Sequence, residues 1–357
     1  MRKLYVAVPA DRLRMDPHTG AGRVWESVLA RLRELTRLRP LAPRRRLRAR
    51  SPDVWLIPGH EGPVKVAEPV VALVHGAAWA LESAAVRELV PPEYLRRFVA
   101  VTEATLGTTD WAIVPSEYAR RGLLEAYGLP AERVVTVPHG VDLGVFNPGR
   151  RGGRATVAQA LGAQRPYVLF ASIPSIRQKN LSALREAVAM LAARGLPHAL
   201  VIAGGLAGGE SAEELAAITA ELPGAPGRVA WLGQVDDLAL AGLMAEADAF
   251  CLPSLLESFG LTALEALACG APVVVSDRGA LPEVVGDAGM VAEPDPEALA
   301  GALERVLGDA ELARELRAAG PKRAADMSWE RTAGGWLTVL QRAARASAHS
   351  EPSTREA

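Results

Sequence analysis

The sequence predicts an α/β fold with two parallel-sheet domains. Short β-branched apolar runs alternate with helical patterns along the whole chain, which is the pattern of strands connected by helices. Several runs are apolar on both faces, as in strands buried between two helix layers. A chain of 357 residues has the length of two ordinary domains. Two such sheets facing each other would leave a central cleft at the carboxyl ends of their strands, where ligands bind.

The alternation places the elements in two sets. In the first half we expect strands at 4–8, 54–57, 70–74, 111–114 and 134–137, and helices at 22–36, 94–108 and 116–127. In the second half we expect strands at 167–171, 199–203, 229–232, 248–252 and 273–276, and helices near 180–194, 211–222, 238–246, 260–269, 295–308 and 309–325. A Gly/Arg-rich break at 147–154 separates the sets, so the predicted domains are 1–150 and 151–328. A last helix, about 329–346, precedes a polar tail at 347–357 that is expected to be disordered.

Composition narrows the function classes. The net charge of −1, with 23% charged residues, gives no basic field for nucleic acid. The two cysteines lack metal-type spacing and are expected to be reduced and buried, as in a cytosolic protein. The first residues run directly into a strand pattern, so no signal peptide is expected. No apolar run approaches the roughly 18 residues of a membrane span. We therefore expect a cytoplasmic protein.

One basic run stands out between residues 37 and 50. It is broken by two prolines and contains Arg37, Arg39, Arg44, Arg45, Arg46, Arg48 and Arg50. Charge runs are usually solvated surface, and a solvated loop is the favoured interpretation. The alternative is a patch for an anionic acceptor or for lipid head groups, with peripheral contact at the inner membrane face.

The most informative segment is residues 253–275, where two carboxylates stand eight positions apart across the start of a helix. Glu257 precedes the helix that begins near Gly260, and Glu265 lies inside it. The first N–H groups of a helix have no partner within it and, with the helix dipole, they form a ready phosphate site. A carboxylate on each side can accept hydrogen bonds from hydroxyls. The pattern indicates an anion flanked by two polyols, as in a nucleotide sugar.

The two acids have separate expected roles. Glu265 would accept from both ribose hydroxyls, because hydrogen bonds to a charged acceptor are roughly twofold stronger. Its neighbours are apolar, so we expect burial, and a buried carboxylate without a partner is costly; the alternative is a solvated glutamate on an ordinary helix. Glu257 would contact hydroxyls of the transferred sugar. Backbone N–H groups for sugar and phosphate oxygens would come from Ser258, Phe259, Gly260 and Leu261.

Two cations follow the predicted strand at 167–171. Arg177 and Lys179 stand where that strand ends and a helix opens. Fixed cations lower the barrier to losing a diphosphate, because negative charge develops on the leaving group. Cations at a helix N-terminus oppose the dipole, so their presence there favours a bound anion. The alternative is two surface cations.

Glycines and a histidine in the first half are further candidates. The Gly20 and Gly22 pair precedes the first helix and could face the donor phosphate, or it could simply cap the helix. A dinucleotide fingerprint would need a small residue where Trp25 stands, so NAD is rejected. His75 ends a predicted strand and could contact a sugar hydroxyl or the reaction centre. His139 is interpreted as a turn or hinge element.

Taken in order, these segments resemble the retaining glycosyltransferases of family 4, which have the GT-B fold. The more specific match lies in the second half, at residues 200–205, 229–234, 246–254, 257–265 and 279–289. Weaker matches in the first half lie at 19–23, around residue 75, at 114–118 and at 137–142. Two features depart from the family. Ser172 and Ile173 stand where the family often has Gly-Arg, and the two cations are separated by Gln178.

The resemblance implies two Rossmann-like domains facing a central cleft, with the last helix crossing back to the first domain. It implies a nucleotide-sugar donor held mainly by the second domain, an acceptor held by the first, and transfer of a hexosyl group with retention. No obligatory metal and no cofactor are implied. The nucleotide base would lie near Gly204, Leu232 and Val235. In the implied front-face substitution, the leaving diphosphate itself accepts the acceptor's proton.

Other classes remain open from the sequence. A nucleotide-sugar epimerase shares the architecture and would need no acceptor, whereas a non-catalytic binder would never release nucleotide. A phosphorylase would need a lysine carrying pyridoxal phosphate, and Lys179 is the one lysine expected near the cleft. The acceptor could be a saccharide, a lipid-linked sugar or a small molecule.

Overall fold

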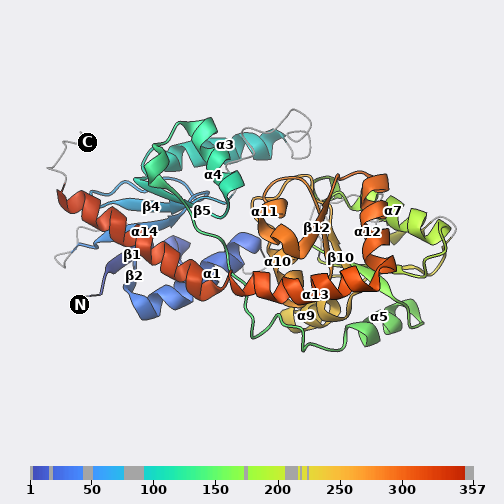
Figure 1. Ribbon diagram of the computed structural model, residues 1–357. Helices are drawn as coiled ribbons and strands as arrows, with labels where there is room; N and C mark the ends of the chain where they lie inside the picture. Colours follow the sequence, from blue (N-terminus) through green and yellow to red (C-terminus); the bar gives the residue numbers. More distant parts are fainter. Residues whose placement is uncertain are drawn as a thin grey trace. The chain divides into compact units, whose positions relative to one another are not determined.

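The computed structural model describes residues 3–15, 19–42, 51–75, 92–172, 176–205, 216–217, 219–222 and 225–349. The chain forms two compact units, each built on a parallel sheet (Figure 1). Unit 1 contains residues 1–140 and 329–357, and unit 2 contains residues 141–328. The predicted α/β class with parallel sheets is therefore confirmed.

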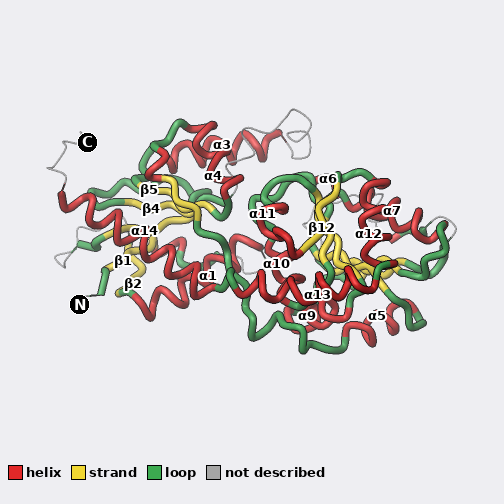
Figure 2. Tube along the Cα trace, in the orientation of Figure 1, coloured by secondary structure: helices red, strands yellow, loops and turns green. Residues whose placement is uncertain are grey.

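Unit 1 has a described sheet with strand order β2-β1-β3-β4-β5-β6. Its strands are β1 (Tyr5–Pro9), β2 (Arg37–Leu41), β3 (Val54–Pro58), β4 (Val70–Leu73), β5 (Trp111–Val114) and β6 (Val134–Thr136). Its helices are α1 (Gly20–Leu35), α3 (Pro92–Leu106), α4 (Glu117–Tyr127) and α14 (Trp329–His349), with single turns η1 (Ala10–Arg12) and η3 (Ala131–Arg133). Figure 2 shows the strands of each unit grouped in yellow between red helices.

The C-terminal helix α14 completes the core of unit 1, as predicted. It packs against α1 and against strands β3, β4 and β5. Trp25 of α1 and Trp336 of α14 are both fully buried, and their ring centroids lie 6.2 Å apart. Two aromatic side chains of this size bury much of the apolar area at such a contact.

Unit 2 has the described strand order β12-β11-β10-β7-β8-β9. Its strands are β7 (Tyr167–Ala171), β8 (Ala199–Ala203), β9 (Val229–Trp231), β10 (Ala249–Leu252), β11 (Val273–Ser276) and β12 (Gly289–Ala292). Its helices are α5 (Gly153–Leu161), α6 (Ile176–Lys179), α7 (Leu181–Ala193), α9 (Asp237–Glu246), α10 (Leu261–Ala268), α11 (Leu281–Val285), α12 (Pro296–Gly308) and α13 (Ala310–Ala325), with the turn η4 (Gly286–Ala288).

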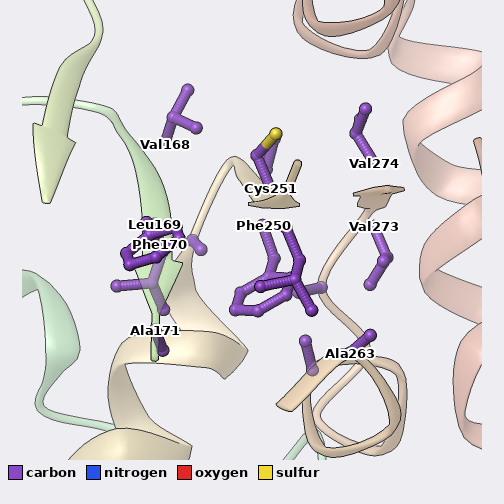
Figure 3. Close-up of a cluster of buried hydrophobic side chains, with 14 of the residues drawn as sticks. Val168, Leu169, Phe170, Ala171, Phe250, Cys251, Ala263, Val273 and Val274 are labelled. Atoms are coloured by element: carbon purple, nitrogen blue, oxygen red, sulfur yellow. The ribbon is translucent and has the colours of Figure 1, made fainter. Parts of the chain in front are cut away.

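The central strands of unit 2 are apolar on both faces because helices cover both. Figure 3 shows Phe250 and Cys251 on opposite sides of β10, with Phe250 directed toward Ala263 of α10. Helices α7 and α12 pack together, and α13 packs on α10. A period-two side-chain direction combined with continuous apolarity is what a strand buried on both faces requires.

Each strand predicted from the sequence is present, and the described residues form two further strands that were not predicted. β2 reads Arg-Leu-Arg-Pro-Leu and β12 reads Gly-Met-Val-Ala, and both lie at a sheet edge with partly exposed side chains. The arginines and proline of β2 weaken an apolar strand pattern, whereas β12 has only four residues and begins with glycine, which is depleted in strands. The helices α5, α6 and α11 were also missed. Most of the helix predicted at 211–222 lies outside the described residues.

The chain passes between the units at residues 140–141 and again at 328–329. Residues 141–150, which the sequence analysis assigned to the first domain, belong to unit 2, where Val141 and Phe146 are buried in the core. The N–H of Val141 donates to the carbonyl of Met327 at 3.0 Å, so the two crossings lie side by side. Of the predicted disordered tail, residues 347–349 end α14, and 350–357 lie outside the described residues.

Candidate active site

The candidate site of unit 2 lies where the strand order reverses. From β7 the chain proceeds to β8 and β9 on one side of the sheet, and from β10 to β11 and β12 on the other. Ligands of open α/β sheets bind at such a switch point, beyond the carboxyl ends of the strands. Lys179 follows β7 and Glu257 follows β10, so the topology brings these two predicted residues to the same crevice.

Lys179 and Glu257 form an ion pair in this crevice. The Lys179 ammonium contacts the Glu257 carboxylate, and the two side chains are 16% and 14% exposed. The Ser254 hydroxyl donates to the same carboxylate at 3.1 Å, and the Ser276 hydroxyl donates to the Ser254 carbonyl. The carboxylate is thereby held in one orientation from two directions. Neither serine was predicted as a site residue.

Gln178 joins the helix that carries the cations to the loop that carries the acid. Its side-chain amide donates to the carbonyl of Leu256 at 3.0 Å, and its main-chain carbonyl accepts from the N–H of Leu255 at 2.8 Å. The residue after Lys179, Asn180, adopts a left-handed conformation and donates to the carbonyl of Pro294 at 2.7 Å. The separation of the two cations by a glutamine therefore has a structural role.

Two glycines bring a third loop close to the acid. A Cβ at Gly279 would lie 2.3 Å from the carbonyl oxygen of Glu257, and the N–H of Ala280 donates to that oxygen at 2.9 Å. Gly260, with φ of +101°, is the N-cap of α10, and a Cβ there would lie 2.6 Å from Leu281. Only glycine adopts these conformations readily while allowing so close an approach.

Glu265 lies inside α10 and is buried, with 5% of its surface exposed. Burial of this carboxylate was expected, and the alternative of a solvated glutamate is excluded. Burial and then the charge of Glu265 raise the pKa of the Cys269 thiol to about 12, so this cysteine stays protonated. The ribose role of Glu265 stays a prediction.

The remaining predicted donor residues surround the start of α10. Ser258 is partly buried, Phe259 packs into the core, and Leu261 begins the helix. Arg177 is exposed in α6, and its guanidinium makes no hydrogen bond or ion pair with the described residues. Of the two predicted cations of this segment, Arg177 is the one that forms no ion pair with a described carboxylate.

Backbone groups at the predicted base site are already engaged. The N–H of Gly204 donates to the carbonyl of Gly233 at 2.8 Å, and its own carbonyl accepts from the Trp231 indole at 3.0 Å. The N–H of Leu232 donates to Ile202 at 2.9 Å. The N–H groups of Gly204 and Leu232 are therefore engaged within the protein, and a base-binding role for Gly204, Leu232 and Val235 stays a prediction.

In unit 1, three histidines follow the carboxyl ends of strands. His60 follows β3, His75 follows β4, and His139 follows β6. His75 Nδ1 and His139 Nε2 are 3.2 Å apart, and the His60 and His75 ring centroids lie 6.2 Å apart. His75 was predicted as a site residue, whereas its pairing with His139 was not. Their positions just after strands were the available signal.

Burial keeps this histidine pair neutral. It lowers the pKa of His139 to about 3, and burial, followed by the charges of His139 and His60, holds the pKa of His75 well below its usual range. Two neutral imidazoles can form one hydrogen bond, in which one ring donates and the other accepts. The contact therefore couples the tautomers of the two rings, because His75 Nδ1 either donates to His139 Nε2 or accepts from it.

The two glycines lie in the first turn of α1, whose N-cap is Thr19. The Thr19 side chain accepts from the N–H of Gly22 at 3.0 Å, and Gly20 is the first residue of the helix. A donor-phosphate role for Gly20 and Gly22 stays a prediction.

The basic run is part strand, not wholly loop. Arg37 and Arg39 lie in β2, and residues 43–50 lie outside the described residues. Across the described part of the chain, no helix combines the length and hydropathy of a membrane span. In the same part, no cluster of three or more His, Cys, Asp or Glu side chains is arranged to hold a metal ion.

Two family models match the chain. "Glycosyltransferase Family 4" matches residues 4–145, and "Glycosyl transferases group 1" matches residues 156–323. The matched regions fall in the two halves of the chain.

Curated relatives are 30–35% identical. A GDP-mannose-dependent alpha-(1-6)-phosphatidylinositol dimannoside mannosyltransferase from Mycobacterium tuberculosis is 33% identical over 71% of this chain and 63% of the relative. A D-inositol 3-phosphate glycosyltransferase from Mycobacterium avium is 34% identical over 78% of this chain and 65% of the relative. The chain thus spans less than two thirds of the length of these relatives.

Solved structures share the fold. Anabaena HepE, in complex with UDP and glucose, superposes with a TM-score of 0.70 at 17% identity over 97% of this chain and all of that chain. WaaG, a glycosyltransferase involved in lipopolysaccharide biosynthesis, has a TM-score of 0.68 at 17% identity with the same coverage. At this identity the likeness concerns the fold alone.

Proposed function

The chain belongs to the group 1 and family 4 glycosyltransferases, and on that premise we propose that it is a retaining hexosyltransferase. It takes the sugar from a nucleotide-diphosphate sugar and transfers it to a hydroxyl of a saccharide, lipid-linked or small-molecule acceptor. The observation that carries the proposal is the Lys179–Glu257 pair at the switch point of unit 2.

Each partner of this pair has a task in the proposed reaction. Lys179 stabilises the charge that develops on the leaving diphosphate, and Arg177 supplies a second cation. Glu257 holds hydroxyls of the donor sugar, and Glu265 holds the ribose. The bond from the anomeric carbon to the diphosphate oxygen breaks, and the bond to the acceptor oxygen forms on the same face. The acceptor's proton passes to the leaving diphosphate, so no protein base is required.

The relatives suggest which substrates to test first. Their names specify a GDP-mannose donor in one case and an inositol phosphate acceptor in another. GDP-mannose is therefore the first donor to try, and polyols bearing phosphate are the first acceptors. A lipid-linked acceptor would place the protein at a membrane surface, where basic segments attract anionic lipids.

The test is a product assay with a panel of nucleotide sugars and acceptors. If the chain is a transferase, nucleoside diphosphate should be released only when an acceptor is present. The new linkage should then have the anomeric configuration of the donor. Product without an acceptor would instead identify an epimerase, and binding without release would identify a sensor.

Variants make the assay specific to the site. Lys179→Ala should lower kcat by about 100-fold or more, because the lost charge acts in the transition state. Lys322→Ala removes an exposed lysine from α13 of the same unit and should leave transfer unchanged. Glu265→Ala should weaken donor affinity, and normal affinity in this variant would contradict the ribose assignment.

A further inference from the structure

Four cationic side chains line one pocket of unit 1. The pocket has a volume of about 540 Å³ and is bounded by Lys3, Tyr5, Arg33, Thr36, Arg37, Leu38 and Arg39. Pockets of a few hundred Å³ are the usual size for small ligands and cofactors. This one contains no acidic residue in its lining.

The pocket lies at the amino ends of the strands. Lys3 precedes β1, Arg37 begins β2, and Arg33 lies in the last turn of α1, which leads into β2. The histidines His60 and His75 follow the carboxyl ends of their strands. Since all described strands of this sheet are parallel, the pocket lies at the amino ends of the strands and the histidines lie at the carboxyl ends. The pocket is therefore separate from the carboxyl ends of the strands, where the acceptor is expected.

None of the four cations forms an ion pair with a carboxylate of the described residues. Lys3 donates to the main-chain carbonyl of Glu34 at 2.6 Å, and the Arg37 guanidinium lies 5.1 Å from the centre of the Tyr5 ring. These contacts restrain both side chains without neutralising them. Like charges gathered at one pocket repel one another, so an anion placed among them is stabilised.

Protection of the sheet edge explains only part of the cluster. β2 is an edge strand, and charged side chains on such strands prevent pairing with other chains. That accounts for Arg37 and Arg39, which lie on β2. It does not account for Lys3 and Arg33, which lie outside β2 and line the same pocket.

We propose that this pocket binds the phosphate group of a ligand other than the nucleotide-sugar donor. The planar fork of arginine matches phosphate oxygens, and charge-assisted hydrogen bonds of this kind are the strong ones. The ligand class is a phosphate monoester or diester, carried either by a soluble metabolite or by a lipid head group. The proposal does not depend on transferase activity, because the pocket lies at the amino ends of the strands, away from the expected acceptor site.

The first experiment titrates the full chain with inorganic phosphate at constant ionic strength, by calorimetry. The test variant is Arg37→Ser with Arg39→Ser, and the matched control is Arg97→Ser with Arg121→Ser, two exposed arginines on α3 and α4. The test variant should bind phosphate at least about tenfold more weakly, and the control should bind like the unmodified chain. Arg33→Gln, outside β2, should also weaken binding, and it guards against a folding defect of the edge strand.

A second arm separates the two sources of phosphate. Vesicles of phosphatidylcholine with about 30 mol% phosphatidylglycerol are compared with phosphatidylcholine alone. Sedimentation with the anionic vesicles that is lost in the Arg37 and Arg39 variant assigns a lipid head group, whereas phosphate binding without sedimentation assigns a soluble ligand. Absence of both, or equal loss in the control variant, overturns the proposal. Donor turnover is not a readout, so either result leaves the transferase proposal standing on its own test.

Discussion

Replacing Gly279 by alanine tests how tightly the Glu257 loop is held. The residue has φ of +64°, and a Cβ there would lie 2.3 Å from the Glu257 carbonyl oxygen and 2.8 Å from its nitrogen. Both neighbours are main-chain atoms, so no side-chain rotation relieves the overlap. The loop that carries Glu257 must move.

A matched glycine separates the two costs. Gly162 has φ of +67° and no atom within 4 Å of its Cβ position, so Gly162→Ala measures backbone strain alone, about 1–2 kcal/mol. Overpacking adds about 1–3 kcal/mol. Gly279→Ala should therefore destabilise unit 2 by about 2–5 kcal/mol. At roughly 3 °C per kcal/mol, the melting temperature should fall by about 3–6 °C in Gly162→Ala and by about 6–15 °C in Gly279→Ala.

Calorimetric melting and a donor-turnover assay on both variants complete the test. Displacing a substrate contact by about 1 Å can cost on the order of 100-fold in rate, so Gly279→Ala should lose activity that Gly162→Ala keeps. If the two variants melt within about 2 °C of each other and turn over donor equally, the reasoning about this contact is wrong.

Three further outcomes are expected. Gln178→Ala removes the amide that holds Leu256 and should lower kcat by about tenfold, with Gln178→Glu restoring little because a carboxylate cannot donate. Glu257→Gln keeps the shape but removes the charge paired with Lys179, so KM for the donor should rise while the melting temperature shifts by less than about 3 °C. Below pH 6.5 the unfolded His139 binds a proton that the folded residue, with a pKa of about 3, does not, so stability falls on acidification by about 1.4 kcal/mol per pH unit. Thermal melts of His139→Asn should fall less steeply between pH 6.5 and about 5, and a parallel pH dependence would contradict this.

The fold could be predicted wherever a strand is buried on both faces. Continuous apolar runs such as β7 and β8 have no other plausible environment in a parallel sheet. The edge strand β2 was missed because its arginines and proline remove the apolar signal, and β12 was missed because its pattern is only four residues long and begins with glycine. Short helices such as α6 and α11 are shorter than two turns, so no periodicity can identify them.

For the candidate site, spacing predicted the residues but not their partners. The position of Lys179 and Glu257 after strands could be predicted, because strand ends meet at one edge of a parallel sheet. That the two side chains pair with each other depends on the strand order, which is not written locally in either segment. The same holds for His139, whose partner His75 is 64 positions away.

Unit 1 is assembled from two segments far apart in the chain, and this affects how it can fold during synthesis. Domains commonly fold in the order of synthesis. Here the body that is begun first is completed last, because Trp336 reaches its place beside Trp25 only when α14 has been made. A chain cut short after residue 328 would contain every residue of unit 2 but would leave exposed the apolar surface of unit 1 that α14 covers.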